Sequence, residues 1–340
     1  MARGTALHPN PHDAFFKATF GLPEHAAGEL ACVLPPDVAA QFDLSTLRRV
    51  ASSYATPGEA DRHADVLLSV GLRDEPGEGL VYVLLEHQST SERWMVLRML
   101  RYLVRVWEHW LREHPTASGL PPIVPVVVSH DPGGWRGPVG LDEALAAGAR
   151  SLEAMREHLP LFRMVVDDLS TVGDAELRRR AMSAMGRLAL GLLKHARRFD
   201  VFFGDLAHWA GTFREVMAAP EGLSALGVVL NYMHLINDQV PQERVAEHIG
   251  ALLGQEAKEA YVTEGERLIQ QGLEKGLQQG LQTGLAQGRR DLLRHLLERR
   301  FGAPLPDEAI VRLNEAAIPE LDRWAERVLT ATSLEDVLKG

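Results

Sequence analysis

The chain has 340 residues, of which 46% are hydrophobic and 24% are charged, a balance typical of a folded globular protein. At about 150 residues per domain, this length predicts two to three structural units. The formal net charge of -10 argues against the positive surface of a non-specific nucleic-acid binder, so any nucleic-acid site must be local.

Cysteine content and apolar runs narrow the class of protein further. A single cysteine, Cys32, excludes an internal disulfide and a cysteine-rich metal cluster. No apolar run reaches the roughly 18 residues of a membrane helix, and the first residues lack the apolar stretch of a signal peptide. We therefore expect a cytoplasmic protein that makes no membrane contact.

Hydrophobic patterning over the first 170 residues predicts a mixed α/β layer. In chain order, the expected elements are a helix from Pro11, a helix over about 24–33, a short helical turn around 43–47, a strand over 48–54, strand-like segments at 63–68 and 84–88, a helix over about 92–113, a buried strand over 122–130 and a weaker strand candidate over 161–169. The order of helix, three strands and helix precedes the buried strand.

A composition shift near 170–173 marks a boundary, after which the pattern is helical to the end of the chain. The sequence therefore predicts an α/β domain followed by an all-helical C-terminal region. The expected units are an α/β domain over 1–170, a helical region over 171–260, a glycine-rich helix over 261–300 and a helical tail over 301–340.

Two acidic residues, Asp65 and Glu86, each lie at the polar end of an apolar, strand-like segment. Turn-forming residues between the segments predict that the two strands pair as neighbours. The two-residue period of a strand sends Glu86 and Gln88 to one face and His87 to the other. Asp65 and Glu86 are then positioned to share one divalent cation, although each polar residue taken alone is better explained as a solvated strand end.

The helix expected over about 92–113 has one basic face. Arg98, Arg101, Arg105 and Arg112 fall within about 60° of one another, opposite an apolar arc that includes Met99. If this helix packs on the sheet that carries Glu86, the guanidinium groups can bind phosphates near the acidic residues. The alternative is an ordinary solvated helix face.

Glycine recurs at every fourth position from Gly272 to Gly288, and leucine directly follows each of the first four glycines, at 273, 277, 281 and 285. Glycine costs about 1 kcal/mol relative to alanine inside a helix, so close backbone contact is the expected compensation. We predict a helix over about 263–300 whose segment 264–300 forms a homo-oligomer or binds another protein. A flexible, partly helical linker is the competing interpretation.

Several segments match one known family in the same order along the chain. They are His12–Lys17, Leu34–Pro35, Asp43–Leu47, Ala64–Leu67, Leu84–Ser89, Met95 with Arg98, Leu100–Tyr102 and Pro122–His130. This series, over about residues 10 to 170, resembles the Rpn family of recombination-promoting nucleases, also called YhgA-like transposases.

The resemblance implies a PD-(D/E)XK nuclease-like fold, a mixed sheet flanked by helices, and Mg²⁺-dependent hydrolysis of DNA phosphodiester bonds, with Mn²⁺ able to substitute. Asp65 and Glu86 then hold the metal as side-chain ligands, and His87 adds its backbone carbonyl. Gln88 stands where many members of the superfamily carry lysine, and we expect it to orient the attacking water. An amide there cannot exchange a proton as lysine does.

The resemblance also implies DNA as the partner of this chain. Lys17 on the first helix and the arginines at 98, 101 and 105 are the residues expected to contact it. The leading hypothesis is an endonuclease linked to DNA recombination, without evidence for strand joining. The alternative is a catalytically weak scaffold that binds DNA or a protein through its helical C-terminal half.

Overall fold

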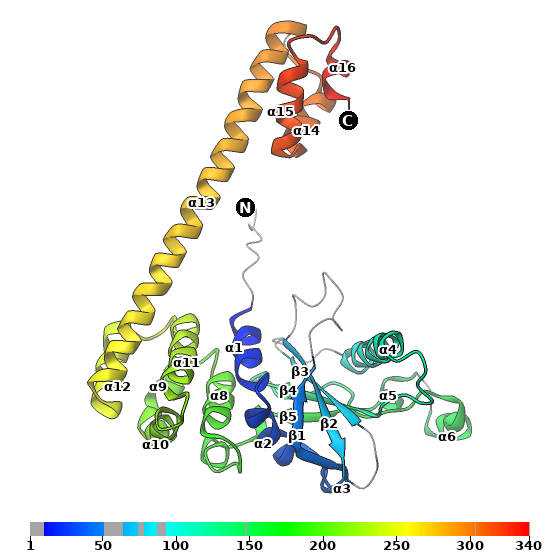
Figure 1. Cartoon of the computed structure of the whole chain (residues 1–340), viewed down its shortest axis with the longest axis vertical. Coiled ribbons are helices and arrows are strands. Elements are labelled where there is room, and N and C mark those ends of the chain that lie inside the picture. The colour runs from blue at the N-terminus through cyan, green and yellow to red at the C-terminus, as the bar shows by residue number, and fades with distance from the viewer. Residues whose placement is uncertain are drawn as a thin grey trace. The chain divides into compact units, whose positions relative to one another are not determined.

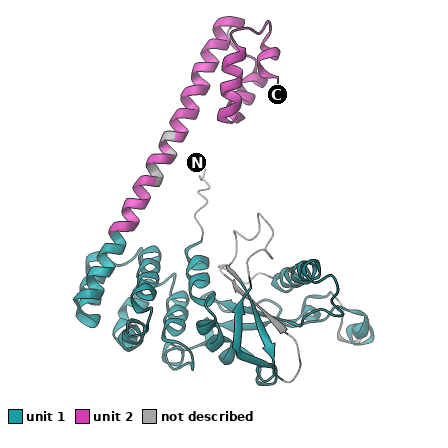
Figure 2. Cartoon of the chain, in the orientation of Figure 1, with its two compact units in different colours: residues 1–265 teal, residues 266–340 magenta. Residues whose placement is uncertain are grey.

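A computed structural model of the chain describes residues 10–50, 64–73, 78–86, 93–146, 148–302 and 304–339. At residues 64–65, 78–86, 149–150, 275–276, 279 and 281 it describes the backbone and not the side chains. The chain divides into two compact units, Met1–Gly265 and Glu266–Gly340 (Figure 2).

The first unit is built around one five-stranded sheet. Its strands are β1 (Phe42–Arg49), β2 (Ala64–Leu72), β3 (Glu78–Glu86), β4 (Ile123–Ser129) and β5 (Val165–Asp168). They lie in the order β1-β2-β3-β4-β5, in which β2 is antiparallel to both β1 and β3, whereas β3, β4 and β5 are parallel to one another. The expected mixed α/β architecture is therefore confirmed.

Helices cover both faces of the sheet (Figure 1). In β2, Val66 and Leu68 are buried in the same core as α1 (Pro11–Phe20), α2 (Pro23–Val33) and α8 (Ala184–Lys194). Leu67, which alternates to the other face, is buried with Met95 and Met99 of α4 (Met95–Glu113). The helix with the arginine face thus covers one side of the sheet, and α1 covers the other.

The N-terminal helices begin where the sequence supplies a suitable first residue. Proline occupies the first position of α1, α2 and α3 (Pro36–Ala39), where its missing N–H is not needed. The Asn10 side chain caps α1 by accepting a hydrogen bond of 3.1 Å from the backbone N–H of His12. α1 and α2 begin within one residue of the starts expected from the sequence, whereas no helix was expected at α3.

One expected element is wrong, because residues 43–47 belong to strand β1 and do not form a helical turn. Asp43 accepts hydrogen bonds from the backbone and hydroxyl of Ser45, and this local turn produces a register shift between Asp43 and Arg48. Thr46 Oγ1 then accepts a hydrogen bond of 2.7 Å from the backbone N–H of Gly71 on β2. The polar residues that form this bulge therefore have the sequence pattern of a helical turn. Residues 51–54, the end of the strand expected there, lie outside the described residues.

The remainder of the first unit is mainly helical, as predicted for the part that follows residue 170; the helices between β4 and β5 were not predicted. After β4 come α5 (Leu141–Ala144), α6 (Ala149–Met155), η2 (Arg156–His158), η3 (Leu169–Thr171), α7 (Asp174–Leu177), α9 (Phe199–Gly204), α10 (Leu206–Met217), α11 (Gly222–Ile236) and α12 (Gln242–Leu253). Trp209 of α10 is fully buried against Gly191 of α8, where a Cβ atom would lie only 2.5 Å from the indole. Glycine at 191 therefore lets these two helices pack closely.

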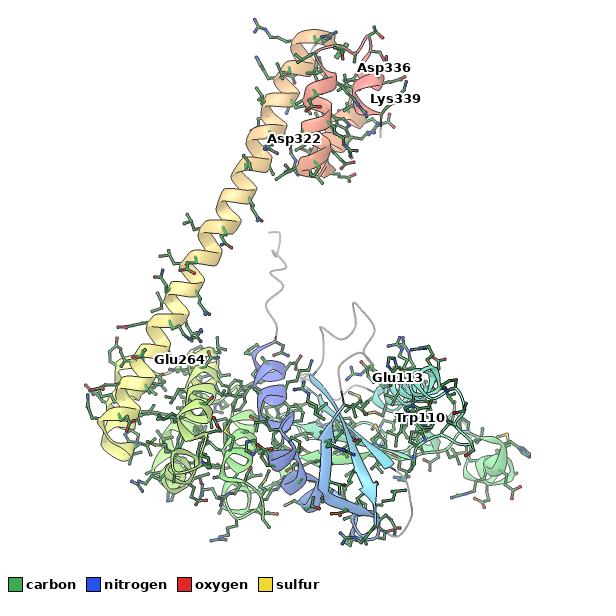
Figure 3. The ribbon with its side chains drawn as sticks, in the orientation of Figure 1. Trp110, Glu113, Glu264, Asp322, Asp336 and Lys339 are labelled. Atoms are coloured by element: carbon green, nitrogen blue, oxygen red, sulfur yellow. The ribbon has the colours of Figure 1, made fainter. Side chains whose placement is uncertain are left out.

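The second unit has its own small core. It contains the C-terminal part of α13 (Gln255–Phe301) together with α14 (Asp307–Glu315), α15 (Ile318–Arg327) and α16 (Leu334–Leu338). Leu297 and Trp324 are among the residues that fill this core. Arg289 of α13 donates a hydrogen bond of 2.6 Å to Asp322 of α15, whose carboxylate is labelled in Figure 3. The all-helical C-terminal region is thus confirmed.

The glycine-rich segment is helical throughout, within α13, which begins at Gln255 and so extends further toward the N-terminus than expected. A Cβ atom added at Gly272, Gly280, Gly284 or Gly288 would meet nothing within 4 Å. Within the described chain, no neighbour therefore uses the space that these glycines leave. No helix in the described part of the chain has both the length and the apolar character needed to cross a membrane.

Candidate active site

The pairing of β2 with β3 determines where the two acidic positions fall. Asp65 lies directly opposite Leu84, and Glu86 follows Leu84 by two residues on the same strand. Because alternate strand positions share a face, the backbone positions of Asp65 and Glu86 lie on the same face of the sheet. Diagonal neighbours of this kind are about 7 to 8 Å apart, a separation that long side chains can bridge.

The face is the one covered by α4. Leu67, two residues beyond Asp65, belongs to the core formed with Met95 and Met99. Glu86 is the last residue of β3 and pairs with Ser129, the last residue of β4. The candidate site therefore lies at the carboxyl ends of two parallel strands, beside the start of β2.

Two of the predicted site residues, His87 and Gln88, lie outside the described residues. For Asp65 and Glu86 the backbone register is described. In the described part of the chain, no group of three or more histidine, cysteine or acidic side chains could hold a metal ion.

A row of polar residues continues from Glu86 across the parallel strands. Ser129 of β4 is buried and pairs in turn with Asp168 of β5. The Asp168 carboxylate accepts hydrogen bonds from the backbone N–H groups of Trp135, at 2.7 Å, and Ser170, at 3.1 Å. Asp168 therefore organises the loop that follows β4, which is a structural role.

A second group of side chains meets at the end of β4, on the side of α1. His130 directly follows Ser129, and its ring centroid is 5.3 Å from that of His12 on α1. His12 Nδ1 lies 2.6 Å from the hydroxyl of Tyr232 on α11, and Tyr232 stacks on Phe15 at 4.0 Å. The helical region thus contributes a side chain at the carboxyl end of β4.

Tyr232 keeps its proton at neutral pH. Burial, followed by the negative charge of Asp13, raises the pKa of Tyr232 well above its usual value. The hydroxyl can therefore donate a hydrogen bond to His12 Nδ1, and a neutral His12 then carries its own proton on Nε2. That arrangement fixes the ring beside His130.

The arginines of α4 lie on the helix that covers the face of Asp65 and Glu86. Arg98 and Arg105 are half-buried, whereas Arg101 is exposed. The predicted apolar arc is largely correct, because Met95, Met99, Leu103 and Val106 are buried. The sequence pattern did not anticipate that Leu97, Val104 and Leu111 would be exposed next to the arginine face.

Lys17 occupies a different position from the arginines. It is half-buried in the last turn of α1, the helix on the opposite side of the sheet from α4. The N-terminus of α1, marked by His12, is the end that approaches β4. The structure therefore associates His12 more closely than Lys17 with the carboxyl ends of the parallel strands.

A buried ion cluster connects β5 with α2. Arg180 donates two hydrogen bonds of 2.8 Å to Asp167 and one of 3.0 Å to Glu29 on α2. Both carboxylates are buried, and burial followed by the charge of Asp167 raises the pKa of Glu29 well above its usual value. One guanidinium cannot neutralise two buried carboxylates, so the cluster favours a protonated Glu29.

The first unit is therefore an α/β domain with an acidic pair, Asp65 and Glu86, at one end of its sheet, and helices follow this domain along the chain. Residues 10–223 match the family described as "Putative transposase, YhgA-like", and the chain belongs to this family. The resemblance to Rpn proteins is thereby confirmed.

Three relatives are informative. Recombination-promoting nuclease RpnD of Escherichia coli O157:H7 is 29% identical over 265 residues, which cover 76% of this chain and 94% of that protein. Recombination-promoting nuclease RpnA of Escherichia coli K12 is 37% identical over 120 residues, or 35% of this chain and 40% of RpnA. Inactive recombination-promoting nuclease-like protein RpnE of the same strain is 32% identical over 121 residues, or 36% of this chain and 39% of RpnE. No solved structure matches the chain.

Proposed function

We propose that this chain is a Mg²⁺-dependent DNA endonuclease of the PD-(D/E)XK type, active on DNA phosphodiester bonds during recombination. The register of β2 and β3, which brings the positions of Asp65 and Glu86 to one face, is the observation that carries this proposal. The names of RpnD and RpnA, both recombination-promoting nucleases, support the same activity.

The residue types at the site suit a hard divalent cation. Two carboxylates and a backbone carbonyl are oxygen ligands of the kind that Mg²⁺ prefers, and Mn²⁺ accepts the same set. Asp65 and Glu86 would supply the carboxylates, and His87 would supply the carbonyl. When bound, the cation polarises the phosphate and lowers the pKa of a coordinated water.

The chain's own polar groups would perform the remaining tasks. Gln88 would hold the attacking water through its amide, which can both donate and accept hydrogen bonds but cannot exchange a proton. The arginines at 98, 101 and 105 would hold phosphates from the α4 side, where the helix covers the face of the acidic pair. Lys17 is the remaining DNA contact in this proposal, from the other face of the sheet.

A plasmid-nicking assay with Mg²⁺ tests the proposal. Asp65→Asn and Glu86→Gln each remove one ligand charge while keeping the side-chain shape, and each should lower the nicking rate by at least about 100-fold. Asp200→Asn is the matched control, because Asp200 is exposed on α9, far along the chain from the sheet edge. Equal nicking by the wild type and Asp65→Asn would contradict the assignment.

A second candidate function is a scaffold that binds DNA or a protein without efficient cleavage. RpnE, a relative of comparable identity to RpnA, is named inactive, so the family includes chains without the activity. The two functions separate when DNA binding and nicking are measured on the same sample. A scaffold would bind DNA through its helical half, and Asp65→Asn would leave its properties unchanged.

Self-association through α13 is a further part of the proposal. Ile269, Leu273 and Leu277 lie four residues apart, and their side chains are 74%, 67% and 73% exposed. The neighbouring glycines border open space, which suits close approach by a second helix. We propose that segment 264–300 pairs with its copy in a homo-oligomer.

Light scattering of the full chain and of a chain that ends before Glu264 tests this pairing. The full chain should have the mass of an oligomer, and the truncated chain should have the mass of one copy. An unchanged oligomeric state after truncation would remove α13 from the interface. A partly helical linker, the alternative, predicts that both chains have the same number of copies per particle.

A further inference from the structure

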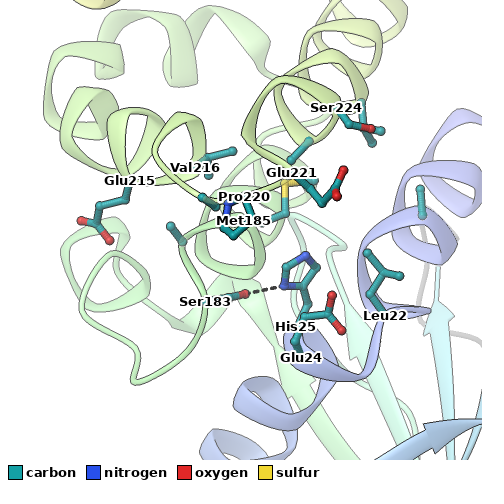
Figure 4. Close-up of a pocket in the computed structure, with 15 residues that line it drawn as sticks. Leu22, Glu24, His25, Ser183, Met185, Glu215, Val216, Pro220, Glu221 and Ser224 are labelled. Carbon is teal, nitrogen blue, oxygen red and sulfur yellow. Dashed lines mark hydrogen bonds between the residues drawn. The ribbon is translucent and has the colours of Figure 1, made fainter.

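A cleft in the first unit lies apart from the acidic pair of the sheet. Its volume is about 680 Å³, and its walls come from α1, α2, α8, α10 and α11 (Figure 4). Pockets that bind small organic molecules have volumes of about 300 to 1,000 Å³. The cleft is therefore large enough for a complete small ligand.

Apolar side chains form most of the lining. Leu22, Met185, Val216, Pro220 and Val228 are among them, from four separate segments of the chain. Such a surface favours a ligand with a hydrocarbon body, because transfer of that body from water releases free energy in proportion to its area. A fully polar ligand would gain no such free energy from this apolar surface.

The charged side chains of the lining are all acidic. Glu24, Glu215 and Glu221 line the cleft, and no lysine or arginine does so among the described residues. Arg187 donates a hydrogen bond to Glu215, which compensates that carboxylate. No ion pair to Glu24 or Glu221 is formed by the side chains that the structure describes.

Ser183, Ser224 and His25 are the other polar residues of the lining, and of these only His25 could carry a positive charge. Its Nδ1 lies 2.8 Å from Ser183 Oγ, which also caps α8 by accepting from the N–H of Gly186. Burial lowers the pKa of His25, with Glu24 acting in the opposite direction, so the ring is neutral at physiological pH. Figure 4 shows the ring within the cleft, with Glu24 and Glu221 to either side.

We infer that this cleft binds a small organic dication, in which two amines are joined by a hydrocarbon chain. The amines would pair with Glu24 and Glu221, while the chain would cover the apolar lining. Anionic ligands are disfavoured, because the lining has carboxylates and no compensating cation except the one on Glu215. This inference is independent of the nuclease proposal, since the cleft shares none of its residues with the acidic pair.

Isothermal titration calorimetry on the full chain, with three six-carbon probes of equal length, tests the inference. The probes are 1,6-diaminohexane, 1,6-hexanediol and the dicarboxylate adipate, which differ mainly in charge. We expect the diamine to bind at least about tenfold more tightly than the diol, as charge-assisted hydrogen bonds allow, and adipate not to bind. No heat from the diamine, or equal affinity for diamine and diol, would overturn the inference.

Matched variants distinguish diamine binding in the cleft from attraction of the diamine to the general negative charge of the chain. Glu24→Gln with Glu221→Gln should reduce the preference for diamine over diol to about onefold, since each substitution removes one charged partner. Glu308→Gln with Glu315→Gln on α14 removes the same total charge from the second unit and should leave the preference unchanged. An equal loss in both double variants would show that binding is non-specific and would overturn the inference.

Discussion

His12 Nδ1 and the Tyr232 hydroxyl lie 2.6 Å apart, although the two residues are separated by 220 positions in the sequence. The contact joins the first helix to α11 of the helical region. It forms beside His130, which follows the strand partner of Glu86. The helical region is therefore part of the structure around the candidate site and not an appendage to the sheet.

Tyr232→Phe should destabilise the protein while leaving it folded. The substitution keeps the stacking on Phe15 but removes the hydroxyl, at an expected cost of about 1 to 3 kcal/mol in the free energy of unfolding. Urea denaturation measures this cost. Imidazole ¹⁵N NMR should show a changed tautomer balance for His12 in this variant.

Tyr261→Phe is the control, because the Tyr261 hydroxyl donates to Gln242 and lies in a different contact. It should lower stability to a similar degree without altering the His12 signals. Unchanged His12 signals in Tyr232→Phe would mean that the hydroxyl does not fix the ring.

The parts of the site that local pattern determines were predictable from the sequence. Asp65 and Glu86 stand out because an acid interrupts an apolar alternation, and the turn residues between them indicate that the strands pair. Residues 43–47 of strand β1 were mistaken for a helical turn because Asp43, Ser45 and Thr46 form a local turn within the strand. Short-range polar contacts of this kind look alike in bulges and in helical turns.

The sequence contains no comparable signal for the long-range contacts. Tyr232 is one of several large residues on an apolar helix, and only the folded chain brings it to His12. Arg180 lies in a run of three arginines that resembles a solvated surface, yet its side chain is only 11% exposed and binds both Asp167 and Glu29. The partners of such residues depend on tertiary packing and not on local periodicity.

The Arg180 cluster predicts a pH-dependent contribution to stability. Because the pKa of Glu29 is raised in the folded chain, folding retains a proton that the unfolded chain releases near pH 4.3, at about the usual value for glutamate. The stabilisation of the folded chain by this proton is fully present below about pH 4.3 and is lost as the pH rises through the folded-state pKa of Glu29. Glu29→Gln should remove the decline, as measured by urea denaturation at a series of pH values.

Arg180→Met should be far more damaging than Glu29→Gln. It leaves Asp167 and Glu29 buried without their cation, at an expected cost of about 3 to 5 kcal/mol in the free energy of unfolding. Arg156→Met, at an exposed arginine of the same unit, should change stability little. Similar stabilities for the two arginine variants would contradict the role assigned to the cluster.

The α4 arginines predict a specific salt dependence of DNA binding. Replacing the arginines at 98, 101 and 105 with glutamine should weaken binding to all sequences alike. It should also reduce the slope of log affinity against log salt by about 2 to 3, or about 0.9 for each lost phosphate contact. Fluorescence anisotropy at several salt concentrations measures the slope. Triple replacement of the exposed arginines at 294, 299 and 323 is the control, and an equal slope change there would indicate general charge alone.

The glycines of α13 provide a test that separates an interface from a linker. Replacing Gly272, Gly280, Gly284 and Gly288 with alanine should favour the helix itself by about 1 kcal/mol per site. If a second helix approaches these positions closely, four methyl groups should nevertheless separate the copies. Light scattering should then show a lower mass, while circular dichroism shows equal or higher helix content.

Gly211→Ala with Gly227→Ala is the control for helix propensity. These glycines also border open space, but they lie on α10 and α11. This control should raise helix stability and leave the mass unchanged. If the α13 variant likewise gains helix content at constant mass, then the glycines do not contact a second copy, and the exposed stripe of α13 belongs to a solvated linker.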